Sequence, residues 1–261
     1  MAISAPHYHL LRTLFESNLL PQNGALLEIG QANWYGDVSP LTMVDDIRKF
    51  VTDPQRRDAL IKRLTQIVEA SEKAHQSPGF DPVKICYDLF FSPVEVQAVD
   101  FGGTETALKL DLNRPIALNR RFEVVINHGT AEHIFNIAQV FMTMHDYTVP
   151  GGLMIHESPF TGWIDHGFYN LQPTLFVDVA LCNQYEICAM FIETLADKTI
   201  LRIARREDVY QLADSKRIPD NAMLYTVLRK GPEERPFEVP MQSYYAHRLS
   251  PDGHAAWHKL R

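Results

Sequence analysis

The sequence predicts an α/β fold in which helices cover both faces of a mostly parallel sheet. Two observations predict it. Short apolar runs that suit strands alternate along the chain with stretches in which apolar residues recur at helical spacing. The first strand-like run, residues 25–30, is apolar at nearly every position, as expected for a strand that is buried on both faces of a parallel sheet. Strands and helices that alternate in this way favour a parallel sheet with helical connections.

The segment after the first strand is expected to be a helical insertion. Ser39-Pro40 and Asp53-Pro54 each combine an N-cap residue with proline at the first helical position, so they predict two helices between about residues 40 and 75. An amphipathic helix is also predicted within the first twenty residues. The distance to the next strand is far longer than one crossover helix requires. We therefore expect a helical insertion at about 37–92, which forms either a lid or a dimer surface. If it forms a dimer surface, the protein is a homo-oligomer.

Apolar runs predict the later strands, and proline and glycine separate them. Thr130 is expected to cap a helix over residues 131–147, Pro150-Gly151-Gly152 predicts a turn, and Pro173 begins a further helix. The later strands are expected at residues 94–100, 107–112, 122–126, 153–157, 185–194, 199–204 and 222–229.

Residues 1–231 are expected to form one α/β domain. Residues 232–261, which are rich in proline, are expected to form an irregular tail that ends in a short helix.

The composition excludes several classes of protein. Hydrophobic residues make up 46% and charged residues 22% of the 261 residues, which is the mix of an ordinary globular chain. No apolar run approaches the roughly 18 residues of a membrane span, and the N-terminus lacks the pattern of a signal peptide, so neither a membrane partner nor secretion is expected. The net charge of -7 repels phosphate backbones and argues against a nucleic-acid partner. Three cysteines without a CxxC pair favour reduced thiols in the cytoplasm.

Polar residues at the ends of the predicted strands indicate a ligand. In parallel sheets, ligands bind beyond the carboxyl ends of the strands. Gly30 allows a tight turn there, and Asp100 offers a carboxylate that can accept hydrogen bonds from both hydroxyls of a ribose. Asp111 offers an acceptor for an adenine amino group, and Leu112 offers an apolar contact for the ring. These residues predict a site for an adenosine-containing ligand.

The ordered set of motifs resembles the class I S-adenosylmethionine-dependent methyltransferases. Pro150-Gly151-Gly152 is the most discriminating of these motifs, and Ala32 departs from the family pattern because it replaces the second glycine of the first motif. The resemblance spans about residues 24–230. The segments that carry it are residues 26–30, 99–100, 110–112, 122–127 and 147–155.

The resemblance implies a Rossmann-like fold, S-adenosyl-L-methionine as the cofactor, and methyl transfer to an oxygen or nitrogen of a small molecule. Two other functions stay open. A nicotinamide-dependent oxidoreductase is opposed by the absence of GxGxxG. A non-catalytic binding module of the same fold is favoured by Ala32. The cofactor-binding residues that we predict are Glu28, Gly30, Asp100, Phe101, Asp111, Leu112, Asn127 and Gly129.

Histidines and aromatic residues gather where the methyl acceptor is expected. Histidine near its ordinary pKa can remove a proton from a hydroxyl or an amine, although each histidine could equally serve only to hold a neighbouring loop. We predict catalytic roles for His156, His133, His166 and Glu157. No metal site is predicted, because the spacing of these residues matches no strong metal-binding pattern.

Residues 156–176 mix aromatic and directional polar side chains, a composition that suits a sugar or a planar molecule. The acceptor is therefore expected to be a small molecule, with a sugar or glycan precursor as one candidate. The acceptor-binding residues that we predict are Trp34, Tyr35, Trp163, Tyr169 and Asn170.

Overall fold

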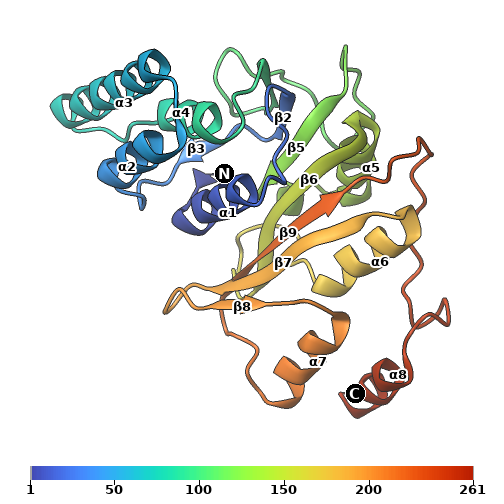
Figure 1. Cartoon of the computed structure of the whole chain (residues 1–261). Coiled ribbons are helices and arrows are strands. Elements are labelled where there is room, and N and C mark those ends of the chain that lie inside the picture. The colour runs from blue at the N-terminus through green and yellow to red at the C-terminus, as the bar shows by residue number, and fades with distance from the viewer. Residues whose placement is uncertain (1, 261) are drawn as a thin grey trace. The chain divides into compact units, whose positions relative to one another are not determined.

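The computed structural model describes residues 2–260, and the chain divides into two compact units. The first unit ends at Leu108 and the second begins at Lys109. The first unit contains the paired strands β4 and β2, and the second contains strands in the order β5-β6-β9-β7-β8 (Figure 1). These strands are β2 (Ala25–Ile29), β4 (Glu95–Val99), β5 (Phe122–His128), β6 (Thr148–Thr161), β7 (Glu186–Thr194), β8 (Ile200–Arg202) and β9 (Ala222–Arg229).

The strand directions confirm the predicted α/β class. β2 and β4 are parallel, and so are β5 and β6. β9 is antiparallel to both β6 and β7, so β7 runs in the same direction as β5 and β6. β8 is antiparallel to β7 at the edge. The strands of each unit are thus mostly parallel, and β9 and β8 are the two reversed strands of the second unit.

The first unit is helical outside its strands. Its helices are α1 (Ala5–Glu16), α2 (Pro40–Phe50), α3 (Pro54–Ala74) and α4 (Asp81–Phe90), and a small parallel pair is formed by β1 (Ala2–Ile3) and β3 (Asn33–Trp34).

Both predicted caps in this unit are present. The Ser39 hydroxyl accepts a hydrogen bond from the Thr42 amide at 3.1 Å, and the Asp53 carboxylate accepts one from the Gln55 amide at 3.0 Å. α2 and α3 pack side by side (Figure 1). α4 was not predicted, because Ser77 to Gly79 reads as a chain break. It nevertheless forms the most buried helix of this unit, with Ile85, Cys86 and Phe90 fully enclosed.

The predicted strand at residues 107–112 is wrong. Only a single bridge forms, between Val99 and Leu108. The chain then turns at Asp111, whose carbonyl oxygen accepts a hydrogen bond from the Arg114 amide at 3.1 Å. The alternation of leucines suggested a strand, but the Asp111 side chain binds the backbone two residues ahead and favours a turn instead.

The predicted turn at Pro150-Gly151-Gly152 lies inside β6. The register jumps from Phe122 opposite Thr148 to Val124 opposite Leu153, so the extra residues bulge out of the ladder. Gly151 has a positive φ of 77°, which glycine adopts without strain. A Cβ at Gly152 would lie 2.9 Å from the Glu123 carbonyl oxygen. The two glycines therefore permit a bulge in a continuous strand.

The helix predicted over residues 131–147 begins later than expected. A 3-10 turn, η1 (Ala131–His133), comes first, and α5 (Ile137–Tyr147) follows. Thr130 makes no side-chain cap. The buried carboxamide of Asn127 takes that role instead, because its Oδ1 accepts hydrogen bonds from the amides of Thr130 and Ala131 at 2.9 and 3.0 Å.

Three further helices of the second unit lie before, between and after its last strands in the chain. α6 (Pro173–Asn183) precedes β7, α7 (Arg206–Asp214) connects β8 to β9, and α8 (Pro251–Lys259) follows an irregular segment near the end of the chain. α7 was not predicted, and none of its residues is buried. Among the helices of residues 2–260, none combines the length and the apolar character that crossing a bilayer requires.

Candidate functional site

In the first unit, the turn after β2 is shaped by Glu28 and Gly30. Gly30 has a φ of 83°, and its amide donates to the Val99 carbonyl oxygen at 2.9 Å. Glu28 is buried, and its Oε1 accepts hydrogen bonds from the Tyr87 hydroxyl at 2.7 Å and from the Ala32 amide at 3.2 Å. Burial raises the pKa of Glu28 to about 7. Glu28 thus holds the backbone of the turn from inside the unit.

Asp100 connects this turn to the loop after β4. Its Oδ2 accepts a hydrogen bond from the Gln31 amide at 2.9 Å, and its Oδ1 accepts one from the Gly102 amide at 2.7 Å. The Gln31 side chain reinforces the connection, because its Oε1 accepts from the Thr104 amide at 2.6 Å and its Nε2 donates to the Thr104 hydroxyl at 3.1 Å. Phe101, beside Asp100, is 66% exposed. The two strand ends are therefore held together, with an aromatic ring open to solvent beside them.

Sequence reasoning missed Gln31 and Thr104, which hold these two loops together. Their hydrogen bonds pair residues that are 73 positions apart. A cavity of about 330 Å³ also reaches this turn, and Glu28, Gln31 and Ala32 form part of its wall together with α4. The first unit therefore has both an ordered turn and open space beside it.

In the second unit, the end of β5 forms an equally ordered loop. The amide of Gly129 donates to the Glu157 carbonyl oxygen at 3.0 Å, and Gly129 has a φ of 71°. Asn127 is fully buried and organises the next turn through its Oδ1. These two residues fix the direction in which the chain leaves the carboxyl end of β5.

The segment Asp111-Leu112 lies beside this loop. The neighbouring Asn113 accepts a hydrogen bond from the Asn136 amide through its Oδ1 at 3.0 Å, and its carbonyl oxygen accepts one from the Asn136 side chain at 3.0 Å. Hydrogen bonds from Asn113 lower the pKa of Asp111. Leu112 is buried and Asp111 is half-buried. The segment that follows Leu112 is thus held against the start of α5.

Glu132, His133 and His166 form a cluster beyond the carboxyl ends of β5 and β6. The rings of the two histidines are 4.9 Å apart, and His166 Nε2 lies 3.8 Å from Glu132 Oε1. Glu132 is fully buried, and burial raises its pKa to about 8. Burial and the neighbouring His166 lower the pKa of His133. The structure brings together two of the predicted catalytic histidines and adds Glu132 to them.

The long loop after β6 is anchored by the residues predicted to bind the acceptor. The Trp163 indole donates to the Ala222 carbonyl oxygen at 3.2 Å, and its ring lies 4.7 Å from that of His166. The Tyr169 hydroxyl donates to the Phe135 carbonyl oxygen at 2.8 Å. The Asn170 side chain donates to the Gly162 carbonyl oxygen at 2.8 Å. These contacts place the loop against the histidine cluster.

His156 lies inside the second unit, away from any surface that an acceptor could reach. It is 1% exposed, stacks on Phe141 at 5.1 Å and meets Phe176 edge-on at 5.1 Å. Burial lowers its pKa to about 3, so the imidazole is neutral and a weak base. A catalytic base must reach the proton that it removes. The surroundings of His156 therefore suit packing in the core and correct the role expected from the sequence.

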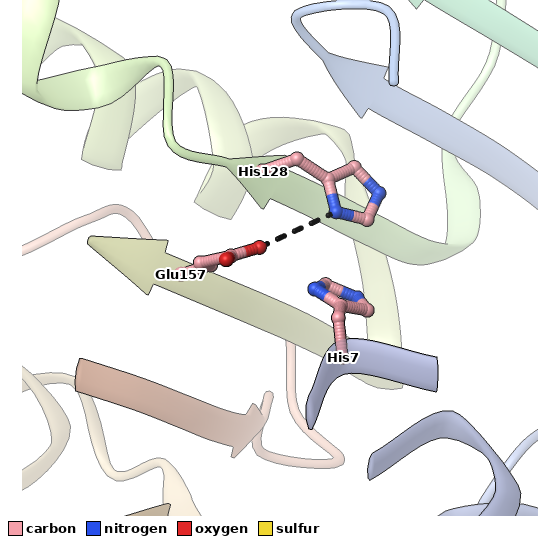
Figure 2. A group of neighbouring side chains, drawn as sticks. All are labelled: His7, His128 and Glu157. Atoms are coloured by element: carbon pink, nitrogen blue, oxygen red, sulfur yellow. Dashed lines mark ion pairs between the residues drawn. The ribbon is translucent and has the colours of Figure 1, made fainter. Parts of the chain in front are cut away.

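Glu157 belongs to a row of buried polar side chains across the sheet. His128 and Glu157 extend toward each other from neighbouring strands, with Nδ1 and Oε2 4.0 Å apart (Figure 2). The Tyr225 hydroxyl lies 3.0 Å from Glu157 Oε1 and 3.2 Å from Glu193 Oε2. Lys198 Nζ lies 3.3 Å from Glu193 Oε1. The row thus extends from β5 to the loop after β7 and ends at a half-exposed cation.

The two aromatic residues after β2 differ in their surroundings. Trp34 is buried, and its ring meets that of Tyr8 edge-on at 6.2 Å. Its amide donates to the Gly79 carbonyl oxygen at 3.0 Å. Tyr35 is 70% exposed. Of this predicted pair, Trp34 packs within the first unit and Tyr35 is accessible to a ligand.

Comparisons with known proteins find similarity in fold. No protein-family profile and no curated protein sequence matches the chain. Among solved structures, an S-adenosylmethionine-dependent methyltransferase from Mesorhizobium loti has a TM-score of 0.45 and 12% identity, covering 87% of this chain and 99% of its own. Coclaurine N-methyltransferase, bound to N-methylheliamine and S-adenosylhomocysteine (SAH), has a TM-score of 0.40 and 8% identity, covering 87% of this chain and 74% of its own.

Proposed function

We propose that this protein transfers a methyl group from S-adenosyl-L-methionine to an oxygen or nitrogen atom of a small molecule. The observation that carries the proposal is the position of Asp100, which follows a parallel strand and lies against the glycine turn of the adjacent strand. A carboxylate at that place suits the vicinal hydroxyls of a ribose.

The residues of each unit fit parts of this cofactor. An ionised carboxylate has about four acceptor positions, and hydrogen bonds from the Gln31 and Gly102 amides occupy two of those of Asp100. Acceptor capacity therefore remains for ribose hydroxyls. Phe101 offers an exposed ring to adenine. In the second unit, the half-buried Asp111 offers an acceptor, whereas Leu112 beside it is buried. We assign the cofactor to these residues together with Glu28, Gly30 and Asn127, which shape the turns.

We place the acceptor against the histidine cluster and the loop after β6. Methyl transfer breaks the bond between the methyl carbon and sulfur, leaves the electron pair on sulfur, and forms a bond from the acceptor's lone pair. The cofactor supplies an activated methyl group. The protein has mainly to align the acceptor and exclude water. Phe135 and Phe168 are exposed beside the cluster, 5.9 Å apart and edge-on. Such rings beside polar groups suit a sugar ring or another small planar acceptor.

The thiols are consistent with a reducing compartment, and we propose a cytoplasmic location. Cys86, Cys182 and Cys188 are all free. Cys86 is completely buried, and burial raises its pKa, so the thiol is unreactive there.

A ligand-binding screen tests the proposal. Thermal unfolding is followed with S-adenosylmethionine, SAH, NAD and NADP, each at increasing concentration. At 100 times its dissociation constant, a ligand of the native state adds about 2.7 kcal/mol of stability. We expect stabilisation by the two adenosyl sulfur compounds only. Stabilisation by NAD or NADP alone would instead identify an oxidoreductase, and binding without methyl transfer to any of a broad acceptor panel would identify a binding module.

A further inference from the structure

The Glu132 carboxylate is the most unusual polar group in the second unit. The side chain is fully buried, and neither oxygen has a hydrogen-bond partner among residues 2–260. His166 Nε2 lies 3.8 Å from Glu132 Oε1, beyond hydrogen-bond distance. Burying an unpaired carboxylate costs several kcal/mol, so native interiors pair such a group with a cation or a metal. The position of Glu132 therefore calls for a positive partner.

His133 and His166 supply the remaining ligand atoms. Each of the three side chains offers one atom, and these atoms all lie within 4.8 Å of one another. Both histidines are exposed, so their rings can adjust. In a tetrahedral zinc site the ligand atoms are about 3.4 Å from one another. To bind the ion, the three ligand atoms therefore have to move closer together by roughly 1 Å.

Two glycines allow the backbone to come this close. A Cβ at Gly167 would lie 3.0 Å from the Glu132 carbonyl oxygen and 3.1 Å from His133 Nδ1. A Cβ at Gly129 would lie 3.1 Å from Glu132 Oε1. The Phe168 amide also donates to the Glu132 carbonyl oxygen at 2.8 Å. The loop that carries His166 is thus held directly against the turn that carries Glu132 and His133.

We propose that Glu132, His133 and His166 bind one divalent transition-metal ion of the zinc class. Ions of the zinc class bind well to two imidazoles and one carboxylate. Mg²⁺ and Ca²⁺ instead prefer sites in which every donor is an oxygen. Three protein ligands leave at least one coordination position open, which is the arrangement of catalytic rather than structural zinc sites.

The role of this metal rests on the proposed function. An acceptor hydroxyl bound at the open position has a lowered pKa, because the ion stabilises the alkoxide. The hydroxyl proton then passes to solvent, and the oxygen lone pair attacks the methyl carbon. His133 and His166 would then act as metal ligands and not as bases. Metal binding itself does not depend on the cofactor.

Titration with Co²⁺ tests the site directly. The protein is first treated with a chelator and desalted, and Co²⁺ is added while visible absorption is recorded. Zn²⁺ is titrated in parallel by calorimetry. We expect one ion per chain and the strong visible bands of four-coordinate Co²⁺, which Zn²⁺ then displaces. The absence of stoichiometric binding of either ion would overturn the proposal.

Single substitutions identify the ligands. Glu132→Gln, His133→Ala and His166→Ala should each weaken Zn²⁺ binding by more than the roughly 10- to 100-fold that the loss of an outer-shell partner costs. His9→Ala, an exposed histidine of the first unit, should leave the affinity unchanged. Because Glu132 is buried, circular dichroism first confirms that its variant folds, and the exposed histidines provide the test if it does not. Unchanged affinity in both histidine variants would contradict the assignment.

The metal and the cofactor are distinguished by measuring each without the other. SAH binding in chelator, with no metal binding, would refute only this site. Metal binding at these residues, with no SAH binding, would support this site and refute the proposed function.

Discussion

Asp100 is the residue whose substitution best tests the cofactor site. A hydrogen bond to a charged group contributes about 1.5–3 kcal/mol, so Asp100→Ala should weaken S-adenosylmethionine binding by roughly 10- to 150-fold. Asp100→Asn keeps one acceptor oxygen and should lose less. Calorimetric titration of the wild type and both variants measures the effect.

Glu105 provides the matched control for Asp100. It is an exposed acid in the same loop, five residues later, so Glu105→Ala removes one negative charge without touching the turn. The affinity of Glu105→Ala for S-adenosylmethionine should stay within about twofold of the wild-type value. Equal losses in the Asp100 and Glu105 variants would show that only the loop's net charge matters, and unchanged affinity in Asp100→Ala would place the ribose elsewhere.

Glu28 should make stability fall as the pH rises. Its pKa is about 7 in the folded chain and 4.5 in its ordinary state. The folded state therefore holds the proton more tightly, and the stabilisation present below about pH 4.5 is lost as the pH rises through 7. The shift corresponds to about 3 kcal/mol. Glu28→Gln, a neutral isostere, should abolish this contribution.

Urea unfolding at pH 5 and pH 8 checks the Glu28 prediction. The wild type should lose more stability between these two pH values than Glu28→Gln does. Glu69→Gln, an exposed acid on α3, should behave like the wild type. The same pH dependence in Glu28→Gln would mean that Glu28 is already ionised in the folded chain at pH 5.

At the scale of the element, α3 depends on its cap. Asp53 accepts a hydrogen bond from the Gln55 amide and thereby satisfies one of the free donors at the helix start. Asp53→Ala should lower the free energy of unfolding by about 1 kcal/mol. Asp58→Ala, at an exposed position inside the same helix, should cost less. Urea denaturation of both variants measures the difference, and equal costs would contradict a capping role.

The polar row across the sheet should contribute to stability through Tyr225. Tyr225→Phe removes a buried hydroxyl that lies within hydrogen-bond distance of both Glu157 and Glu193. We expect a loss of about 1–3 kcal/mol, because buried carboxylates lose a donor. Tyr245→Phe, at an exposed position, should be nearly neutral. Thermal unfolding compares the two, and an unchanged midpoint in Tyr225→Phe would show that the hydroxyl is dispensable.

At the scale of the whole molecule, the net charge of -7 should repel the phosphate backbones of nucleic acids. We expect no binding to labelled single- or double-stranded oligonucleotides at about 10 µM protein and about 150 mM salt. Proteins that neutralise phosphates bind more tightly as salt is lowered. Fluorescence anisotropy at about 30 mM salt should therefore also show no binding. A signal that strengthens at low salt would reveal a basic surface that the net charge conceals.

Several elements could be predicted because their signals are local. Ser39 and Asp53 cap their helices through residues two or three positions away, and the alternation in residues 222–229 matches β9. α4 was missed because the preceding Ser77-Pro78-Gly79 suggests a chain break, whereas the helix is stabilised by burying most of its side chains. The bulge in β6 was missed because proline and glycine also suit a turn, and only pairing with neighbouring strands distinguishes the two.

The sequence by itself determined the α/β class and which residues follow the strand ends. Both depend on local signals, namely the spacing of apolar residues and the turn-forming residues, which extend over only a few positions. It also placed the histidines near one another along the chain. Only the tertiary structure decided which of them are buried, because burial depends on elements far apart in sequence. His156 is enclosed by Phe141 and Phe176, whereas His133 and His166 stay accessible beside a buried Glu132. Access and desolvation determine which titratable groups can bind a ligand, and both are properties of the folded chain.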